Sequence, residues 1–294
     1  MKFKIVDVYS TEIFGGNPAG VVIIPEEDDF PQHTSMQKTA AELRYSETVF
    51  IKKISDKFQT VYFTPTDEVP LCGHATIGAF YALLSEGVIK KNQTYLCSTK
   101  CGELKIYVES ENIFMDMAKP ELFETLDERQ SDELYGSFAV SSEGQGFVSG
   151  STEYLLPRIA YSGLKDIMLP VKDEKELSKL SPDFSLISEI SKRYSVVGVH
   201  AFSVNNSDGF IHARNFAPLV GIDEEAATGT SNGALTFYLH QNGIIKESSL
   251  NTIIQGEKMN RPSKIFTTIH TEKDSVNIRV GGSAVVLASG EIFL

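Results

Sequence analysis

Two side chains that can exchange protons, Cys72 and His74, stand on either side of Gly73. The ten residues that follow, 75–84, are almost wholly apolar. A helix that is apolar on all sides is a buried helix, so the pattern predicts one that begins at Gly73 and His74. Such an end presents unpaired backbone N–H groups and a positive partial charge, which suit a carboxylate or a phosphate. The alternative is a plain core helix with a tight glycine at its start.

The imidazole and the thiol at this helix start each have a chemical and a structural interpretation. His74 can donate a hydrogen bond or shuttle a proton, or it can be a satisfied structural histidine. Cys72 could be a nucleophile or a base, because a thiol at a helix N-terminus is acidified. The alternative is that Cys72 is a buried residue without reactivity, which is the commoner case for a lone cysteine.

A third candidate is Glu47, which lies between Ser46 and Thr48 at the start of an apolar segment. A carboxylate at the rim of a closed, largely apolar cleft can give and take protons near neutral pH. The alternative is a surface glutamate at the end of a strand. The sequence contains no GxGxxG, GxxxxGK[ST] or HExxH pattern, so nucleotide-dependent and zinc-protease functions lack support.

The helix start has a counterpart 156 positions later in the chain. Residues 223–245 align with residues 67–89 at this constant offset, and Thr228 aligns with Cys72. By the same alignment, Glu225 and Thr230 are the second-half counterparts of the first pocket. Six of the 23 aligned pairs are identical: Asp67/Asp223, Glu68/Glu224, Gly73/Gly229, Leu83/Leu239, Gly87/Gly243 and Ile89/Ile245.

A duplication of this domain-sized period predicts two similar domains rather than a solenoid. Short strands around a central apolar helix favour a β-barrel-like sheet wrapped on that helix in each half, which is an α+β fold. Two such domains can aim two helix N-termini at one cleft, where small ligands usually bind.

The rest of the chain supplies the elements that would position these residues. Strands are predicted at 2–8, 21–24, 45–51, 60–63, 95–96, 102–108, 113–117, 157–161, 196–204, 209–216, 276–280 and 284–287. Further helices are predicted at 33–43, 172–180 and 183–194. We expect a turn-rich loop at 15–20, a charged linker or surface segment at 119–135, and a strand-like stretch at 145–147.

Composition and charge narrow the function classes. The chain has 294 residues and a net charge of −12 without a basic stripe, so no nucleic acid partner is expected. The sequence has no run of about 18 apolar residues that would span a membrane, and Asp7 interrupts the N-terminal segment before any signal-peptide core. Three cysteines are too few for a disulfide framework, which favours a reduced cytoplasmic protein. Cys97 and Cys101 lack the further ligands of a metal site, so no metal is expected.

Together with other short motifs, these features resemble the PhzF-like family, named for phenazine biosynthesis. The matching segments span nearly the whole chain in the expected order: Asp7 with Phe14 and Gly16-Asn17-Pro18, Ser46-Glu47-Thr48-x-Phe50, Phe63-Thr64-Pro65, Cys72-Gly73-His74-Ala75-Thr76, Arg214-x-Phe216-x-Pro218, Ala227-Thr228-Gly229 and Gly281-Gly282-x-Ala284. The resemblance implies the diaminopimelate-epimerase-like fold, with the active site between two barrel domains. The domains would be residues 1–115 plus 285–294 and residues 116–284. A homodimer that uses no cofactor is also implied.

The resemblance further assigns roles to residues of this chain. The acid–base glutamate of the family maps to Glu47 and its pocket histidine to His74, while its glycine-rich second loop maps to Gly229 and Thr230. The substrate-binding residues that it implies are Ser46, Gly73, His74, Glu225, Gly229 and Thr230.

This sequence departs from the family pattern at the second helix start. Glu225 stands where the named family member has aspartate, and Thr230 stands where it has serine; the added methylene of Glu225 alters a tight site. The epimerases of this fold use two cysteines, one at each helix start. Because Thr228 occupies the second of these positions, a two-thiol racemase is disfavoured and Cys72 is interpreted as structural.

The sequence therefore predicts a cofactor-independent isomerase of a small anionic, carboxylate-bearing metabolite. Glu47 would move the proton, while His74 and Glu225 would orient or relay. Two alternatives stay open at this point: a one-base epimerase, racemase or dehydratase that uses Cys72 or Glu47, and a non-catalytic binding or interaction protein.

Overall fold

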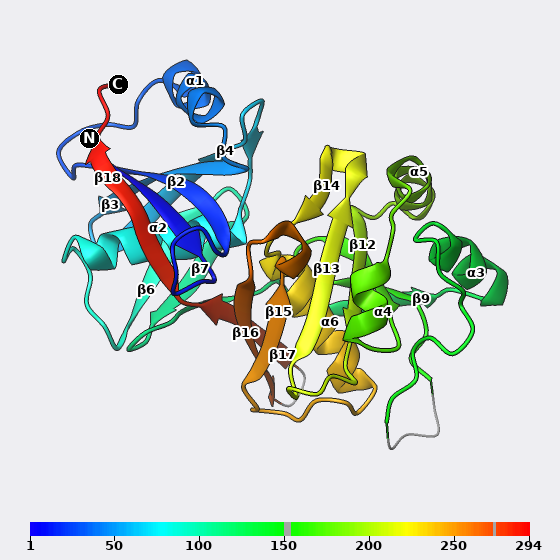
Figure 1. The fold of residues 1–294 in the computed structure, drawn as a ribbon. Coiled ribbons are helices and arrows are strands. Elements are labelled where there is room, and N and C mark those ends of the chain that lie inside the picture. Colours follow the sequence, from blue (N-terminus) through cyan, green and yellow to red (C-terminus); the bar gives the residue numbers. More distant parts are fainter. Residues whose placement is uncertain (150–153, 273–274) are drawn as a thin grey trace. The chain divides into compact units, whose positions relative to one another are not determined.

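The computed structural model describes residues 1–149, 154–272 and 275–294 (Figure 1). The chain divides into two compact units. The first unit comprises Met1–Asp116 and Gly281–Leu294, and the second comprises Met117–Val280.

The first unit is a sheet that wraps around one helix. Its elements are β1 (Lys2–Val8), β2 (Asn17–Ile24), α1 (His33–Leu43), β3 (Glu47–Ile54), β4 (Lys57–Phe63), β5 (Glu68–Val69), α2 (Gly73–Ser85), β6 (Gln93–Thr99), β7 (Gly102–Val108), β8 (Ile113–Asp116) and β18 (Ala284–Glu291). The strands follow the order β18, β1, β2, β3, β4, β6, β7, β8. The pairs β2–β3 and β4–β6 are parallel and the other pairs are antiparallel, while the short β5 adds to β4.

The central helix α2 is the buried helix that the sequence predicts. Nine of its 13 residues are buried, and it lies against β1, β2, β3, β8 and β18. Gly78 makes this close packing possible, because a Cβ there would lie only 3.0 Å from Val8 Cγ2. The helix ends just before Gly87, whose φ of 71° is readily adopted by glycine.

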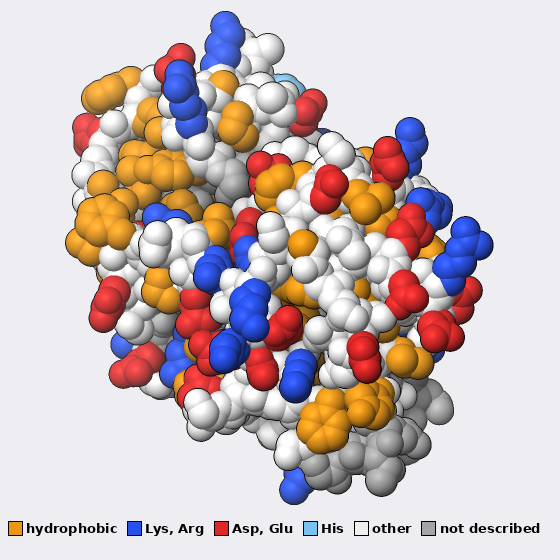
Figure 2. Space-filling view, turned by 45° about the vertical axis from the view of Figure 1, so that its right-hand side comes forward, with side chains coloured by type: hydrophobic (Ala, Val, Ile, Leu, Met, Phe, Trp, Pro, Cys, Tyr) orange, Lys and Arg blue, Asp and Glu red, His pale blue; other side chains and the backbone are white. Residues whose placement is uncertain are grey.

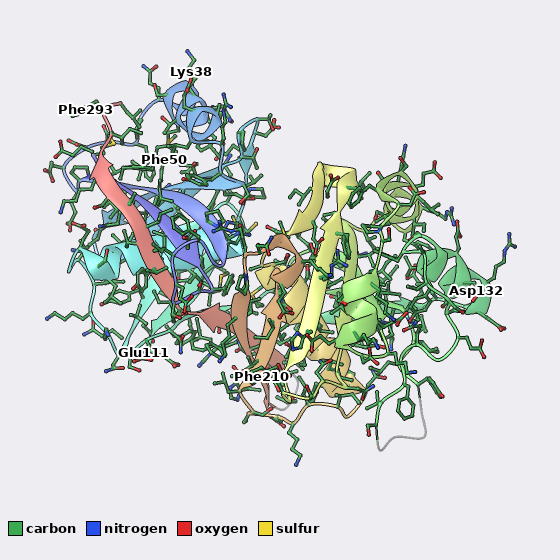
Figure 3. The ribbon with its side chains drawn as sticks, viewed as in Figure 1. Lys38, Phe50, Glu111, Asp132, Phe210 and Phe293 are labelled. Carbon is green, nitrogen blue, oxygen red and sulfur yellow. The ribbon has the colours of Figure 1, made fainter. Side chains whose placement is uncertain are left out.

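The outer helix α1 covers a second apolar layer of the first unit. Met36 and Ala40 on α1 pack in one cluster with Phe50 and Phe63. The two phenylalanine rings meet edge to face at 5.8 Å between centroids. Figure 3 shows Phe50 inside this layer, whereas Lys38 on α1 points away from it.

The second unit repeats the topology of the first. Its elements are β9 (Glu121–Thr125), α3 (Glu128–Gly136), β10 (Arg158–Tyr161), β11 (Lys165–Pro170), α4 (Glu174–Lys179), α5 (Phe184–Tyr194), β12 (Gly198–Ser203), β13 (Ile211–Ala217), η1 (Pro218–Val220), β14 (Ile222–Glu225), α6 (Gly229–Gln241), β15 (Asn251–Gln255), η2 (Glu257–Met259), β16 (Ser263–Glu272) and β17 (Ser275–Gly282), of which β17 has its last two residues in the first unit. The strands β10, β11, β12, β13, β15 and β16 pair with the same alternation of antiparallel and parallel neighbours as β1, β2, β3, β4, β6 and β7. The strand β14 adds to β13 as β5 adds to β4.

The two central helices confirm the internal repeat. Both α2 and α6 have 13 residues, and their first residues and last residues are each 156 positions apart. The helix α6 lies against β9, β10, β11 and β16. Each helix follows a short strand, β5 before α2 and β14 before α6.

The charged segment 119–135, predicted as a linker or surface segment, is largely exposed but is not a linker. It forms β9 and α3, and Leu134 and Tyr135 are buried in the core of the second unit. A reciprocal capping box between Asp127 and Gln130 begins α3. The charged residues occupy the solvent side of an amphipathic segment, so composition alone concealed its buried face.

Several shorter predictions are also corrected. Residues 17–20 belong to β2 rather than to a loop, because they pair with β1 along its end. Residues 145–147 form a turn with an isolated bridge from Phe147 to Tyr154. The strands β5, β11, β14, β15 and β16 were not predicted; β11 is buried over its last five residues and therefore lacks a polar alternation. The other predicted helices and strands are confirmed, with shifted ends.

The surface carries both signs of charge. On the face that Figure 2 shows, Lys and Arg side chains are interspersed with Asp and Glu side chains. Across the described ranges, no helix has both the length and the hydrophobicity needed to cross a membrane.

Candidate active site

Glu47 is the first residue of β3 and stands opposite Ala19 of the parallel strand β2. Its side chain is only 14% exposed. Its Oε2 is buried and accepts no hydrogen bond from any residue that the structure describes. Leaving a buried acceptor unsatisfied costs free energy, so a ligand donor or a proton at this oxygen would relieve that cost.

The imidazole of His74, the second residue of α2, has polar neighbours at both ring nitrogens. Its Nε2 lies 3.4 Å from Glu47 Oε2 and 3.4 Å from Ser46 Oγ. Its Nδ1 lies 3.4 Å from Asn17 Nδ2 and 3.3 Å from Cys72 Sγ. The start of β3, the start of β2 and the start of α2 therefore meet around one imidazole.

Burial decides the charge of this imidazole. His74 is 4% exposed, and this desolvation lowers its pKa, against the opposing effects of the Glu47 charge and a hydrogen bond to the backbone of Pro18. A histidine whose pKa is lowered is neutral at pH 7. A neutral imidazole carries one N–H donor and one acceptor, so His74 lies beside Glu47 without pairing with it as a cation.

The first turn of α2 is anchored from inside the unit. Cys72 is the N-cap residue, with an extended backbone at φ −139°. Thr76 Oγ1 donates to the carbonyl of Cys72 at 2.7 Å and lies 2.6 Å from the hydroxyl of Tyr62. A Cβ on Gly73 would meet only Met115 Sδ at 3.8 Å among the described atoms, so packing does not require glycine there. Gly73 instead leaves the backbone N–H groups of the helix start open to close approach by a ligand.

The second-unit residues gather at the equivalent helix start. Gly229 begins α6, Thr228 is its N-cap residue and Glu225 ends β14. Thr228 Oγ1 donates to Glu225 Oε2 at 2.8 Å. Gly163, at φ 127°, leaves space for Thr230, since a Cβ there would lie 3.0 Å from the Thr230 methyl group.

The structure thus sorts the predicted site residues into two groups. Ser46, Glu47, Gly73 and His74 lie together at the start of α2. Glu225, Gly229 and Thr230 lie at the start of α6. The expectation that both helix starts serve one substrate stays a prediction.

Sequence reasoning missed a buried polar network behind Glu225. Its members are Gln255, Asn232, His200, Asn215, Ser231 and Asp166. Burial lowers the pKa of His200 to about 4 and raises the pKa of Asp166. A usable signal existed in β12 and β13, where polar residues interrupt strands that are buried throughout. Such side chains must find partners inside the protein.

Two groups of described side chains could hold a metal ion. One is Glu47, Cys72 and His74, and the other is Glu174, His212 and Glu257; within each group the donor atoms lie within 4.8 Å of one another. Cysteine, histidine and carboxylate donors suit Zn²⁺. In the second group His212 already bonds Glu257 at 2.8 Å through Nδ1. The expectation that the protein uses no metal stays a prediction.

Comparison with known proteins places this geometry in context. The family described as phenazine biosynthesis-like protein matches residues 6–290. An uncharacterized isomerase of Clostridium acetobutylicum is 34% identical over 98% of this chain and 97% of its own length. A PhzF-family phenazine biosynthesis protein of Bacillus anthracis superposes with a TM-score of 0.87 at 22% identity, covering 100% of this chain and 99% of that chain. A hydroxyproline epimerase of Agrobacterium vitis gives 0.63 at 14% identity, covering 99% and 91%. The structural likenesses show the diaminopimelate-epimerase-like fold.

Proposed function

Because the chain belongs to the phenazine biosynthesis-like protein family and curated relatives are named isomerases, it is an enzyme of the isomerase class, and we propose that it acts by proton transfer on a small carboxylate-bearing metabolite. The non-catalytic binding protein considered from the sequence is thereby set aside. The proposal includes Glu47 as the proton carrier and a reaction that needs no cofactor.

One observation carries this proposal. The buried Glu47 Oε2 has no hydrogen-bond donor in the described part of the chain and lies 3.4 Å from an imidazole that burial keeps neutral. A carboxylate that is fully hydrogen-bonded is a poor base, because each bond stabilises its charged form. The Glu47 Oε2 atom is buried beside His74 but not saturated with hydrogen bonds, which suits a group that must take up and release a proton.

The proposed step conserves atoms and electrons within the substrate. Glu47 takes a proton from one carbon, and the electron pair left behind is delocalised into the substrate. Glu47 then returns the proton to another carbon, which gives an isomer. No electron leaves the substrate, so the step requires neither an oxidant nor a reductant.

The remaining predicted residues serve binding in this proposal. The backbone N–H groups at Gly73 and the Ser46 hydroxyl receive the anionic group, since a helix N-terminus favours negative charge. In the second unit, Gly229 and Thr230 are proposed to contact the substrate, and Glu225 to orient it. The net charge of −12 makes such local positive ends necessary for an anionic ligand.

The proposal is tested with a panel of small carboxylates in D₂O, followed by NMR. We expect at least one compound to take up deuterium or to rearrange with the wild-type protein. Glu47→Gln should slow that reaction about 100-fold or more, whereas Glu26→Gln, a surface glutamate of the same unit, should not. A fully active Glu47→Gln protein would remove Glu47 from the mechanism.

A second candidate, a one-base epimerase or dehydratase, is favoured by one contact. Cys72 Sγ lies 3.3 Å from His74 Nδ1, which is the arrangement of a thiol with an adjacent base. Inactivation by a thiol reagent that substrate slows would support this alternative. Inactivation at the same rate with and without substrate would count against it.

A further inference from the structure

Gln255 connects the core of the second unit to the loop that follows Glu225, the last residue of β14. It is the last residue of β15 and is fully buried. Its Nε2 donates to the carbonyl of Glu225 at 2.8 Å and to Thr228 Oγ1 at 3.1 Å. Its Oε1 accepts the backbone N–H of Thr228 at 3.3 Å. One amide therefore binds the loop at three points.

Asn232 fixes the direction of the Gln255 amide. Its Nδ2 donates to the Thr228 carbonyl and to Gln255 Oε1, each at 2.8 Å. Its Oδ1 lies 3.2 Å from His200 Nε2, and His200 Nδ1 lies 3.2 Å from Asn215 Nδ2. A neutral histidine with its hydrogen on Nε2 satisfies both contacts. The orientation of each side chain is thus set by the next one.

The direction of the Thr228 hydroxyl follows from this arrangement. A hydroxyl has one hydrogen to donate. Because Gln255 Nε2 donates to Thr228 Oγ1, the hydroxyl hydrogen is left for Glu225 Oε2, which lies 2.8 Å away. Gln255 therefore influences the Glu225 carboxylate without touching it.

The backbone at the end of β15 limits how far Gln255 can move. Gly256 follows it at φ 80°, and a Cβ there would lie 2.6 Å from the carbonyl oxygen of Ala226. A side chain at this position would push the strand end away from the loop. The close approach holds Gln255 beside the residues it binds.

We infer that Gln255 is a positioning residue, which fixes the Thr228 hydroxyl and through it the carboxylate of Glu225 in the geometry needed for turnover. This inference rests on the proposed function, in which Glu225 orients the substrate. It assigns the buried amide network a role in the reaction, in addition to its role in holding the start of α6.

The kinetic test uses the substrate on which the wild-type protein acts. Gln255→Leu and Thr228→Val should each lower kcat about 10- to 100-fold with little change in KM. A small displacement of the Glu225 carboxylate from its reactive geometry can lower the rate by such a factor. Thr228→Ser keeps the hydroxyl and should restore turnover to within about threefold of wild type. The double variant should lose no more than the more damaged single variant, because both changes act on turnover through the Thr228 hydroxyl. Gln241→Leu, at the exposed end of α6, is the control.

A second measurement does not depend on turnover. The side-chain amide protons of Gln255 should exchange slowly with water in the wild type and in Thr228→Ser, and at least about tenfold faster in Thr228→Val, as local opening becomes easier. If the wild type moves no proton on any substrate, the proposed function fails. The exchange rates still test whether Gln255 is bonded to the Thr228 hydroxyl. Wild-type kcat in Gln255→Leu, additive losses in the double variant, or unchanged exchange would overturn the inference.

Discussion

The starts of α2 and α6 have the same backbone and different chemistry. Each helix follows an extended N-cap residue, Cys72 in one and Thr228 in the other. In each, a side chain four residues on bonds the N-cap carbonyl, Thr76 at 2.7 Å and Asn232 at 2.8 Å. The duplication has therefore kept the device that holds the first turn, while the residues around it have diverged.

The difference lies in how completely the nearby carboxylates are bonded. Glu47 Oε2 has only a 3.4 Å contact to His74 among the described residues. Glu225 Oε2 accepts a 2.8 Å hydrogen bond whose donor is itself held by Gln255. A carboxylate that must exchange a proton is best left unsaturated, and one that must hold a fixed position is best bonded firmly. On this comparison we propose proton transfer at the first helix start and positioning at the second.

The largest expected effect separates these two carboxylates. Glu47→Gln should lower kcat about 10²- to 10⁴-fold, the contribution typical of general acid–base catalysis. Glu225→Gln keeps an acceptor for the Thr228 hydroxyl and should lose only about tenfold. Steady-state rates on one substrate measure both. Equal losses would break the division of roles between the two helix starts.

Acid should weaken the second helix start through His200. Its pKa is about 4 in the folded protein and about 6.5 in the unfolded chain, so the unfolded chain binds the extra proton between these values. The stability from neutral His200 is present above pH about 6.5 and falls by about 3 kcal/mol as the pH drops towards 4. The free energy of unfolding in urea, measured for the wild type and for His200→Gln across this pH range, checks the predicted fall. A variant that loses as much stability as the wild type would contradict the assignment.

A smaller effect is expected from the glycines that let each helix approach its sheet. A Cβ on Gly233 of α6 would lie 2.6 Å from Ser162 Oγ, so Gly233→Ala should cost about 1–3 kcal/mol through overpacking. Gly136, at the end of α3, has no described atom within 4 Å of a built Cβ. Gly136→Ala should therefore be neutral or stabilise by up to about 1 kcal/mol. The free energy of unfolding in urea gives both values, and equal shifts would argue against the close approach.

The smallest expected effect concerns Cys72. If the thiol is structural, Cys72→Ala should keep activity to within about threefold, because a role outside proton transfer leaves the 100-fold general-base contribution intact. Its control is Cys101→Ala, since Cys101 is exposed and lies outside the site. Rates measured on the same substrate decide the point. A 100-fold loss of activity in Cys72→Ala would assign the proton transfer to the thiol and support the one-base alternative.

The sequence predicted the parts of the fold that local patterns control. The apolar run after His74 located α2, because a helix buried on all sides has an almost wholly apolar composition, and the repeat at Gly229 located α6. The linker alternative for segment 119–135 was wrong, since a half-buried segment of many charges resembles a linker until its partners are known. The homodimer, the cytoplasmic location and the absence of a cofactor stay predictions.

The site was predicted only where a short motif holds it. Ser46, Glu47 and His74 lie in such motifs, and the structure brings them together. Gln255 is distant in sequence from Glu225 and reaches it only because β15 ends beside the loop before α6. Contacts of this kind depend on strand register, which a single sequence does not reveal.

The central claim is that the Glu47 carboxylate carries the proton, and chemical rescue tests it most directly. Glu47→Ala should lose about 100-fold or more in turnover, and added formate should restore activity in proportion to its concentration by supplying a carboxylate to the vacated space. Acetate, being larger, should rescue less well. Wild-type turnover by Glu47→Ala without any added carboxylate would contradict the account.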